Sequence, residues 1–411
     1  MAKQFEKIEK TGKADVAVDK MGKKDIADII ANSDVAASIA NSDAPWRVPT
    51  KHNWEYKRLG DVCDFVGGGT PAKSNADYYE GNIPWATVRD MLNFKLTETE
   101  LRITEEAVNN SATNILPAGM IVISTHVGLG KICELMQNTA INQDLKGVLF
   151  SDKSIDKYYF VYWYRSVADY IISKGRGATV KGVTLDFMRN LQIPVPTREV
   201  QERIVAELDK INEVIEDCRE LVRNLDDLAQ SLFYNFFGDP VTNPKGWVVK
   251  KFSEVFKLSS GDGLSAKQIE PGPFPVYGGN GIVGYHATSN LGGNNIIIGR
   301  VGALCGNIRL VKGDIFVTDN AFITTFKEIL NDKFAEYLLT LLDLRQYAKA
   351  AAQPVISNSS LKNIQIPLPP LQLQQEFAKR IELIEFQKKA VEETIANLKT
   401  LLDSRMDYWF N

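Results

Sequence analysis

The chain has 411 residues, enough for two or three domains, and no apolar run long enough to span a membrane. Its four cysteines lie far apart without a C-x-x-C pair, which excludes a zinc ribbon and suits a reducing cytoplasm. Its three histidines are scattered and form no metal-site pattern. The formal net charge of −3 argues against a protein that binds nucleic acid by electrostatic attraction alone, but it allows a specific reader whose basic residues share one face.

Residues 1–53 differ in composition from the rest of the chain. They are rich in Lys, Asp and Ala, contain few aromatic residues and repeat the pentapeptide IANSD. A segment of this composition buries too little apolar surface to offset the entropy of folding. We therefore expect residues 1–53 to be a mobile extension or linker.

Beyond residue 53 the sequence is an internal duplication. WEYKRLGDV at residues 54–62 resembles WVVKKFSEV at 247–255, and LQIPVP at 191–196 resembles IQIPLP at 364–369. The first pair of landmarks is 193 residues apart and the second 173, so the second half is about 20 residues shorter. The landmarks predict two related globular domains, at residues 54–197 and 245–370.

Each globular domain is predicted to be mixed α/β. Short buried strands are expected within MIVISTHV at residues 120–127 and NNIIIGRVG at 294–302, because apolar β-branched residues dominate both runs. Helices are expected just downstream, at residues 156–173 and 332–348. The overall prediction is an α+β protein in which two globular domains alternate with long helices.

A long helix is predicted after each Pro-rich landmark, at residues 198–238 and 371–411. Apolar residues recur there at alternating spacings of four and three, which is the heptad pattern of a coiled-coil seam. Proline before each helix and Gly238 after the first one mark the ends. Lys388 and Arg405 interrupt the pattern, and we expect them to set register or to face a partner. The predicted seam consists of Ile204, Leu208, Ile211, Ile215, Val222, Leu225, Leu232 and Phe236 in the first helix, and Phe377, Ile381, Ile384, Val391, Ile395, Leu398, Leu402 and Trp409 in the second.

The stretch GGGTPAKS at residues 67–74 is close to a phosphate-binding loop, G-x-x-x-x-G-K-[ST], but Ala72 stands where the pattern needs glycine. The matching stretch of the second half, SGDGLSAKQ, lacks the pattern entirely, and GGGTPAKS has neither the buried strand before it nor the helix after it that a phosphate loop requires. No S-adenosylmethionine loop, nucleophile elbow or methyltransferase catalytic segment is found. The sequence therefore predicts no catalytic site.

The landmarks together resemble the specificity subunit of type I restriction–modification systems. The resemblance rests on GDVCDFVGGGTPAKSNADYYEGNIPW, LQIPVPTREVQERI, FFGDP, YGGNGIVGYH, IIIGRVGALCGNI, VTDNAF and IQIPLPPLQLQQEF. It implies two target-recognition domains, each reading half of an asymmetric bipartite double-stranded DNA site, and two spacer helices packed as an antiparallel coiled coil. It also implies two modification (methyltransferase) subunits and two restriction subunits as partners, no membrane association, and a chain without cofactor, with S-adenosylmethionine, ATP and Mg²⁺ on the partners.

Residue chemistry in the Gly-rich loops supplies candidates for DNA contact, since Arg and Lys favour guanine edges while Asn and Gln favour adenine. The candidates are Lys73, Arg89, His126, Lys131, Lys174, Arg176, Thr179, Lys181, Lys267, Asn280, His286, Arg300, Gln353 and Asn358. Two alternatives stay open at this point: a coiled-coil scaffold that does not read DNA, and the specificity subunit of a methylation-only system.

Overall fold

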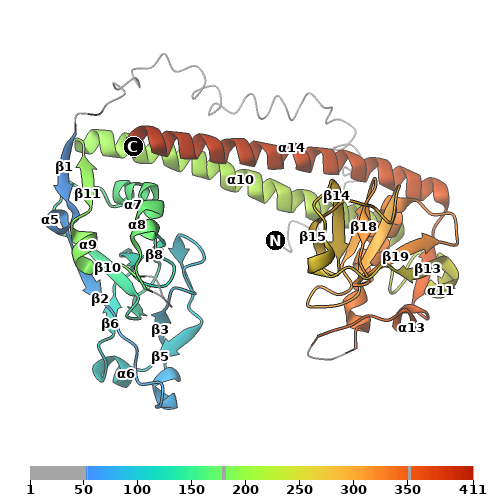
Figure 1. Cartoon of the computed structure of the whole chain (residues 1–411), viewed down its shortest axis with the longest axis horizontal. Coiled ribbons are helices and arrows are strands. Elements are labelled where there is room, and N and C mark those ends of the chain that lie inside the picture. Colours follow the sequence, from blue (N-terminus) through green and yellow to red (C-terminus); the bar gives the residue numbers. More distant parts are fainter. Residues whose placement is uncertain (1–51, 53, 178–181, 350–352, 411) are drawn as a thin grey trace. The chain divides into compact units, whose positions relative to one another are not determined.

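The computed structural model describes residues 52, 54–177, 182–349 and 353–410. Its described residues form two compact units. Unit 1 comprises the described part of residues 1–215 together with the end of the chain from Asn397, and unit 2 comprises residues 216–396. Each unit combines a globular α/β part with one end of each of two long helices (Figure 1). The expected extension at residues 1–53 lies almost entirely outside the described residues.

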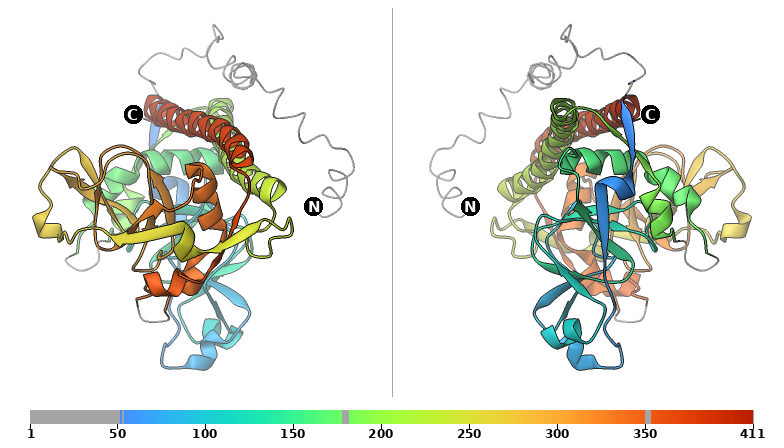
Figure 2. Two further views of the ribbon diagram at one scale, coloured as in Figure 1. Left: turned by 90° about the vertical axis from the view of Figure 1, so that its right-hand side faces the viewer. Right: turned by 90° about the vertical axis from the view of Figure 1, so that its left-hand side faces the viewer.

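The two long helices are α10 (Arg198–Phe237) and α14 (Leu371–Phe410), each of 40 residues. They run antiparallel and side by side (Figures 1 and 2). In unit 1, Glu207 near the start of α10 contacts Arg405 near the end of α14. In unit 2, Asp226 in the later part of α10 contacts Lys388 in an earlier part of α14. Gly238 follows α10 with a φ of 76°, and its N–H donates to the Tyr234 carbonyl at 2.8 Å, as expected of a glycine stop.

Most of the predicted seam is buried between these helices or under the globular parts. Lys388 and Arg405, the two interruptions, bridge the helix pair. The Lys388 ammonium lies 2.6 Å from Asp226 in unit 2, and the Arg405 guanidinium bonds Glu207 in unit 1. The buried seam residues are Ile204, Leu208, Ile211, Ile215, Leu225, Leu232, Phe377, Ile381, Ile384, Val391 and Trp409, and the half-buried ones are Val222, Phe236, Ile395, Leu398 and Leu402.

The sequence landmarks at the start and end of each half pair with one another. In unit 1, β1 (Glu55–Arg58) pairs antiparallel with β11 (Gln192–Val195). In unit 2, β12 (Val248–Lys251) pairs in the same way with β20 (Gln365–Leu368). Each landmark pair therefore closes one globular part just before its long helix begins.

A buried glutamine fixes the start of each long helix. Gln201 accepts the Asp156 N–H at 2.7 Å and donates to the Pro196 carbonyl at 2.9 Å. Gln374 accepts the Asn331 N–H at 2.9 Å and donates to the Pro369 carbonyl at 2.8 Å in unit 2. The duplication thus extends to individual side-chain hydrogen bonds.

Unit 1 contains two further sheets, with strand orders β2-β10-β7-β8-β4 and β5-β3-β9-β6. Helix α7 packs in the core that also buries the end of α14. The strands are β2 (Cys63–Gly67), β3 (Ile83–Ala86), β4 (Lys95–Leu96), β5 (Leu101–Ile103), β6 (Asn114–Leu116), β7 (Ile121–Ser124), β8 (Ile132–Leu135), β9 (Thr139–Ile141) and β10 (Leu145–Phe150), and the helices are α5 (Leu59–Val62), η1 (Ala76–Tyr79), α6 (Glu105–Asn109), α7 (Lys157–Ser166), α8 (Ala168–Lys174) and α9 (Leu185–Arg189).

Unit 2 repeats this plan with fewer strands, in the orders β13-β19-β16-β17 and β15-β14-β18. The shortening predicted from the landmarks falls between β14 and β18, where the described chain has no counterpart of β4 or α6. The strands are β13 (Phe256–Ser260), β14 (Phe274–Gly278), β15 (Gly281–His286), β16 (Asn295–Gly299), β17 (Ile308–Val311), β18 (Phe316–Val317) and β19 (Ala321–Phe326), and the helices are α11 (Phe252–Val255), η2 (Ala266–Gln268), α12 (Asp332–Leu341), η3 (Leu344–Tyr347) and α13 (Asn358–Leu361).

The mixed α/β class and the pair of long packed helices are confirmed. The expected continuous helices at residues 156–173 and 332–348 are wrong in detail. The first is interrupted at Val167, between α7 and α8. The second ends at Leu341, because Asp343 adopts a left-handed φ of 43° that an α-helix cannot continue through.

Candidate nucleic-acid interface

Two loops of unit 1 meet where the parallel strands β3 and β9 end. Ala86 and Ile141 are opposite one another in the parallel register, and the Asn142 N–H donates to the Ala86 carbonyl at 3.0 Å. The chain leaves the sheet at both places, so residues 87–90 and residues 142–144 lie next to each other. We call these two segments loop pair 1.

Unit 2 contains the same construction. Tyr277 on β14 is opposite Val317 on β18, and the Thr318 N–H donates to the Tyr277 carbonyl at 2.9 Å. Gly278 ends β14 and pairs with Gly281 of β15, so residues 279 and 280 form a tight hairpin turn where unit 1 has a longer loop. We call residues 278–280 and 318–320 loop pair 2. The matching registers place Arg89 and Asn280 at equivalent positions, each three residues beyond the paired strand residue.

The glycine stretch that resembles a phosphate loop owes its composition to these loops. A Cβ on Gly68 would lie 2.1 Å from the Ile141 carbonyl oxygen, and one on Gly261 would lie 2.3 Å from the Val317 carbonyl oxygen. Both distances are far inside van der Waals contact. The glycines therefore allow the backbone to approach the strand that leads into each loop pair, and this packing accounts for them without a nucleotide.

A third loop joins each loop pair by matched backbone hydrogen bonds. In unit 1 the β7–β8 loop donates from the Thr125 N–H to the Asp144 carbonyl at 2.9 Å, and accepts the Val183 N–H at 2.9 Å. Val183 follows Gly182, which exchanges reciprocal backbone bonds with Arg176. Arg176 and Gly182 are thereby held beside loop pair 1.

The corresponding bonds of unit 2 run from the Arg300 N–H to the Asn320 carbonyl, and from the Ile356 N–H to the Arg300 carbonyl, both at 2.9 Å. The Lys349 N–H donates to the Val355 carbonyl at 3.0 Å, a bond that corresponds to those between Arg176 and Gly182. Each unit thus presents three connected loops, although few of their side chains are alike.

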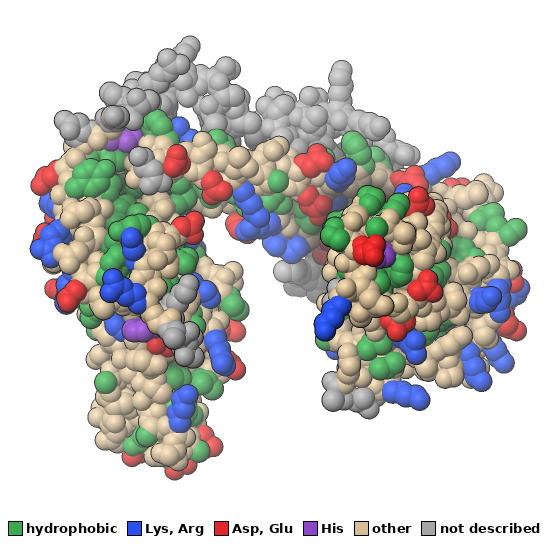
Figure 3. All heavy atoms as spheres, in the orientation of Figure 1, with side chains coloured by type: hydrophobic (Ala, Val, Ile, Leu, Met, Phe, Trp, Pro, Cys, Tyr) green, Lys and Arg blue, Asp and Glu red, His purple; other side chains and the backbone are tan. Residues whose placement is uncertain are grey.

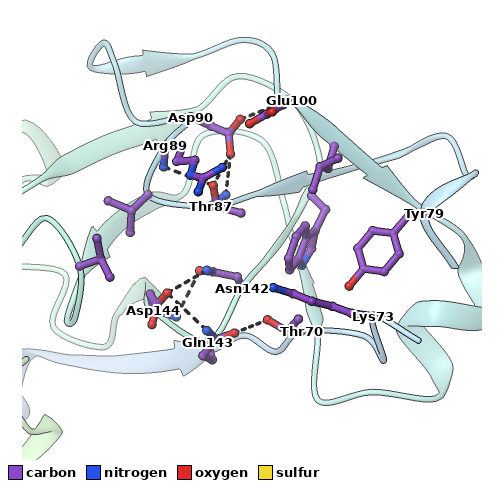
Figure 4. Close-up of a pocket in the computed structure, with 14 residues that line it drawn as sticks. Thr70, Lys73, Tyr79, Thr87, Arg89, Asp90, Glu100, Asn142, Gln143 and Asp144 are labelled. Atoms are coloured by element: carbon purple, nitrogen blue, oxygen red, sulfur yellow. Dashed lines mark hydrogen bonds between the residues drawn. The ribbon is translucent and has the colours of Figure 1, made fainter. Parts of the chain in front are cut away.

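Loop pair 1 borders a cavity of about 570 Å³ (Figure 4). In Figure 4, Arg89 and Thr87 face Asn142 and Gln143 across it, while Lys73 enters from a third side. Tyr79 lines the cavity and donates from its hydroxyl to the Pro71 carbonyl at 2.8 Å. Burial raises the pKa of the Tyr79 hydroxyl, so it remains a neutral donor at physiological pH.

The carboxylates of this cavity are held by the fold. Asp90 accepts the Thr87 N–H at 2.7 Å and the Glu100 N–H at 2.7 Å. Asp144 accepts from the Asn142 amide at 3.1 Å, and Asn142 in return accepts the Asp144 N–H at 3.1 Å. These bonds order both segments of loop pair 1 before any ligand arrives.

The structure brings several predicted DNA-contact residues together at these loops. Lys73, Arg89 and His126 are exposed around loop pair 1, and Arg176, which is bonded to Gly182, is exposed nearby. Asn280 is exposed in loop pair 2. Arg300 is half-buried beside it, with its guanidinium over the Phe322 ring. Gln353, Asn358 and Lys267 are exposed in unit 2, and Lys174 is exposed at the end of α8; Thr179 and Lys181 lie outside the described residues.

Two candidates are used within the fold instead. Lys131 donates to the backbone carbonyls of Val88 and Met91 at 3.3 and 3.2 Å. His286 is 9% exposed, and its Nδ1 accepts the Glu270 N–H at 3.0 Å. Their geometry favours structural roles, because a hydrogen-bonded, covered group is not presented to a ligand.

Gln143 and Asp319 are exposed in segments 142–144 and 318–320, and the residue-by-residue choice did not include them. A signal for them exists in the sequence, because polar residues follow a short apolar strand in both INQD and VTDN. Only the parallel pairing of distant strands shows that the segments with Gln143 and Asp319 lie next to those with Arg89 and Asn280. Figure 3 shows basic and acidic side chains intermixed on the visible face of both units, rather than one basic surface.

Comparison with known proteins identifies the fold. The family model for the type I restriction modification DNA specificity domain matches residues 51–220 and again residues 244–399. The chain belongs to this family. It contains two of the specificity domains in tandem, as the duplication predicts.

Curated relatives include the EcoprrI specificity subunit of Escherichia coli, 26% identical over 78% of this chain and 84% of the relative. The MjaIX specificity subunit of Methanocaldococcus jannaschii is 26% identical over 53% of this chain and 55% of the relative, so this match spans about half of that protein's length. A solved type I restriction–modification S subunit from M. genitalium has a TM-score of 0.52 at 18% identity, covering 89% of this chain and 98% of that one.

Among the described residues of this specificity subunit, no helix is both long and apolar enough to cross a bilayer.

Proposed function

We propose that this specificity subunit reads an asymmetric, bipartite DNA sequence, with unit 1 and unit 2 each recognising one half. The observation that carries the proposal is the duplicated set of three loops. The backbone bonds that join the loops are repeated, whereas exposed residues at equivalent positions, such as Arg89 and Asn280, differ in chemistry. Two units with the same loop backbone and different exposed side chains suit a DNA target with two different halves.

The long helices support a gapped target. Each helix has 40 residues and is therefore about 60 Å long. Half-sites read by linked domains tend to be separated by one duplex turn, roughly 34–36 Å, or its multiples. The helix pair is long enough to set such a gap.

We further propose that the subunit is non-catalytic and acts in the cytoplasm. In this proposal it directs two methyltransferase subunits and two restriction subunits to the site, and those partners carry S-adenosylmethionine, ATP and Mg²⁺. The family membership and the relatives, which are named as specificity subunits, support this division of labour.

The test is co-expression of the chain with its modification subunit in a host free of other methyltransferases, followed by sequencing that detects N6-methyladenine. The expected result is one gapped motif with two different halves. A symmetric or ungapped motif, or no methylation beyond that of the modification subunit alone, would contradict the proposal.

A further inference from the structure

Loop pairs 1 and 2 place residues of different chemistry at corresponding exposed positions. Arg89 and Asn280 are both exposed and both lie three residues beyond the paired strand residue. Neither the Arg89 guanidinium nor the Asn280 amide has a hydrogen bond or ion pair with another side chain of the described residues. Their donors therefore remain available.

The backbone beneath these side chains is held rigidly in both units. In unit 1, Asp90 fixes residues 87–90 through the bonds described above. In unit 2, Gly278 and Gly281 pair on either side of Asn280 in the β14–β15 hairpin, and the Arg309 guanidinium donates to the Asn280 carbonyl at 3.2 Å. A group on a preorganised backbone loses less entropy on binding, which is what discrimination between bases requires.

The charge around Arg89 favours a base edge over a phosphate. Asp90, Glu100 and Asp144 line the same cavity as Lys73 and Arg89. Carboxylates repel phosphate, whereas a base edge in the major groove carries both donors and acceptors and suits a mixed surface. Gln143, across the cavity from Arg89, accepts from the Thr70 hydroxyl and donates to Asp144 at 3.3 Å, so its amide is oriented by the loop.

We infer that Arg89 and Asn280 are equivalent base-reading residues, one for each half of the target. Arg89 forms a bidentate contact with the O6 and N7 atoms of a guanine, and Asn280 forms one with the N6 and N7 atoms of an adenine. The half read by unit 1 therefore contains a specified guanine at the position where the half read by unit 2 contains a specified adenine. This inference rests on the proposed DNA-reading function.

The test compares Arg89→Ala, Asn280→Ala and the wild-type chain, each co-expressed with the modification subunit and analysed by N6-methyladenine sequencing. Arg89→Ala should relax one guanine in one half of the motif, with a roughly 5- to 150-fold loss of discrimination at that base pair. Asn280→Ala should relax one adenine in the other half. Each variant should leave the opposite half unchanged.

Arg102→Ala is the control matched in charge. Arg102 is exposed on β5 of the same unit and does not line the cavity. Its loss should leave the motif intact. A phosphate contact by Arg89 would instead lower methylation equally at all sequences without relaxing any base, and that result would overturn the inference.

Failures of the two proposals are distinguishable. If the wild-type chain yields no gapped motif, the proposed function fails. If the wild-type motif is gapped but Arg89→Ala leaves it unchanged, or alters both halves, only the assignment of Arg89 fails. Should Arg89→Ala unfold on thermal analysis, Arg89→Gln decides, because it should shift the preference at the same position from guanine towards adenine.

Discussion

Unit 1 and unit 2 share one fold, and their comparison separates the residues that the fold requires from those that DNA recognition requires. Features that repeat are mostly internal: the strand pairs at the landmarks, the buried Gln201 and Gln374, and the glycines under the loops. Features that differ lie at exposed tips, where Arg89 corresponds to Asn280. The duplication has kept the frame and allowed the side chains that face outward to diverge.

The largest expected effect comes from filling the space that the glycines leave. Gly68→Ala should destabilise unit 1 by about 3 kcal/mol or more, because the new Cβ would clash with backbone. Gly261→Ala should do the same in unit 2, and each should lower the unfolding temperature by roughly 6–12 °C. Thermal unfolding of the intact chain measures both.

The same stretches contain matched controls for these substitutions. A Cβ added to Gly67 or to Gly263 would meet no atom within 4 Å, and neither glycine has a positive φ. Gly67→Ala and Gly263→Ala should therefore change stability by less than about 0.5 kcal/mol. Equal losses for Gly67→Ala and Gly68→Ala would show that close backbone approach is not the reason for the glycines.

The two ion pairs that bridge the long helices should differ in strength. Glu207 is 15% exposed, bonds Arg405 and also accepts from the Trp409 indole N–H at 3.1 Å. Asp226, the partner of Lys388, is 57% exposed. We expect Glu207→Ala to cost about 2 kcal/mol, because it leaves charged and polar donors unpaired.

Asp226→Ala should cost less than about 1 kcal/mol, because solvent and salt screen an exposed pair. Urea unfolding of both variants and the wild-type chain, at low and at high salt, measures the difference. The opposite order of destabilisation would contradict this account of the two pairs.

A smaller effect is expected from acid. The Lys57 ammonium, 2.8 Å away, and the Ser154 N–H lower the pKa of Asp152 to about 2. Because this pKa is lower in the folded than in the unfolded chain, the pair stabilises unit 1 above the unfolded pKa of about 4 and loses this contribution as the pH falls towards 2. Asp152→Asn should cost about 1 kcal/mol at pH 7, after allowance for solvent screening, and nothing near pH 2.

Unit 2 provides the comparison for this pH dependence. Its Lys250–Glu328 pair, 2.6 Å long, occupies the position equivalent to Lys57–Asp152. Glu328→Gln should leave the acid dependence that Asp152 confers intact. A pH-independent difference between Asp152→Asn and the wild-type chain would exclude the ion pair as its cause.

The sequence predicted the parts of the fold that have a local signature. Alternating spacings of four and three predicted α10 and α14, and the paired landmarks predicted two domains of one plan. The end of α12 was harder to predict, because Asp343 reverses the chain through a left-handed conformation that side-chain periodicity does not encode.

The candidate site was only partly predictable, for a related reason. Arg89 and Asn280 were chosen for their chemistry, but their equivalence depends on parallel pairing between strands that are far apart in the chain. Pairing of that kind is set by tertiary packing. For the same reason, residue type alone could not show that His286 is covered and hydrogen-bonded, whereas Gln143 is exposed.

The most direct test of the central claim, that each unit reads one half of the target, is an exchange of one domain. Residues 54–197 are replaced by the corresponding domain of a relative with a different target, and the methylated motif is sequenced in the presence of the modification subunit. The account predicts that one half of the motif changes, while the other half keeps its sequence. A change in both halves, or in neither, would contradict it.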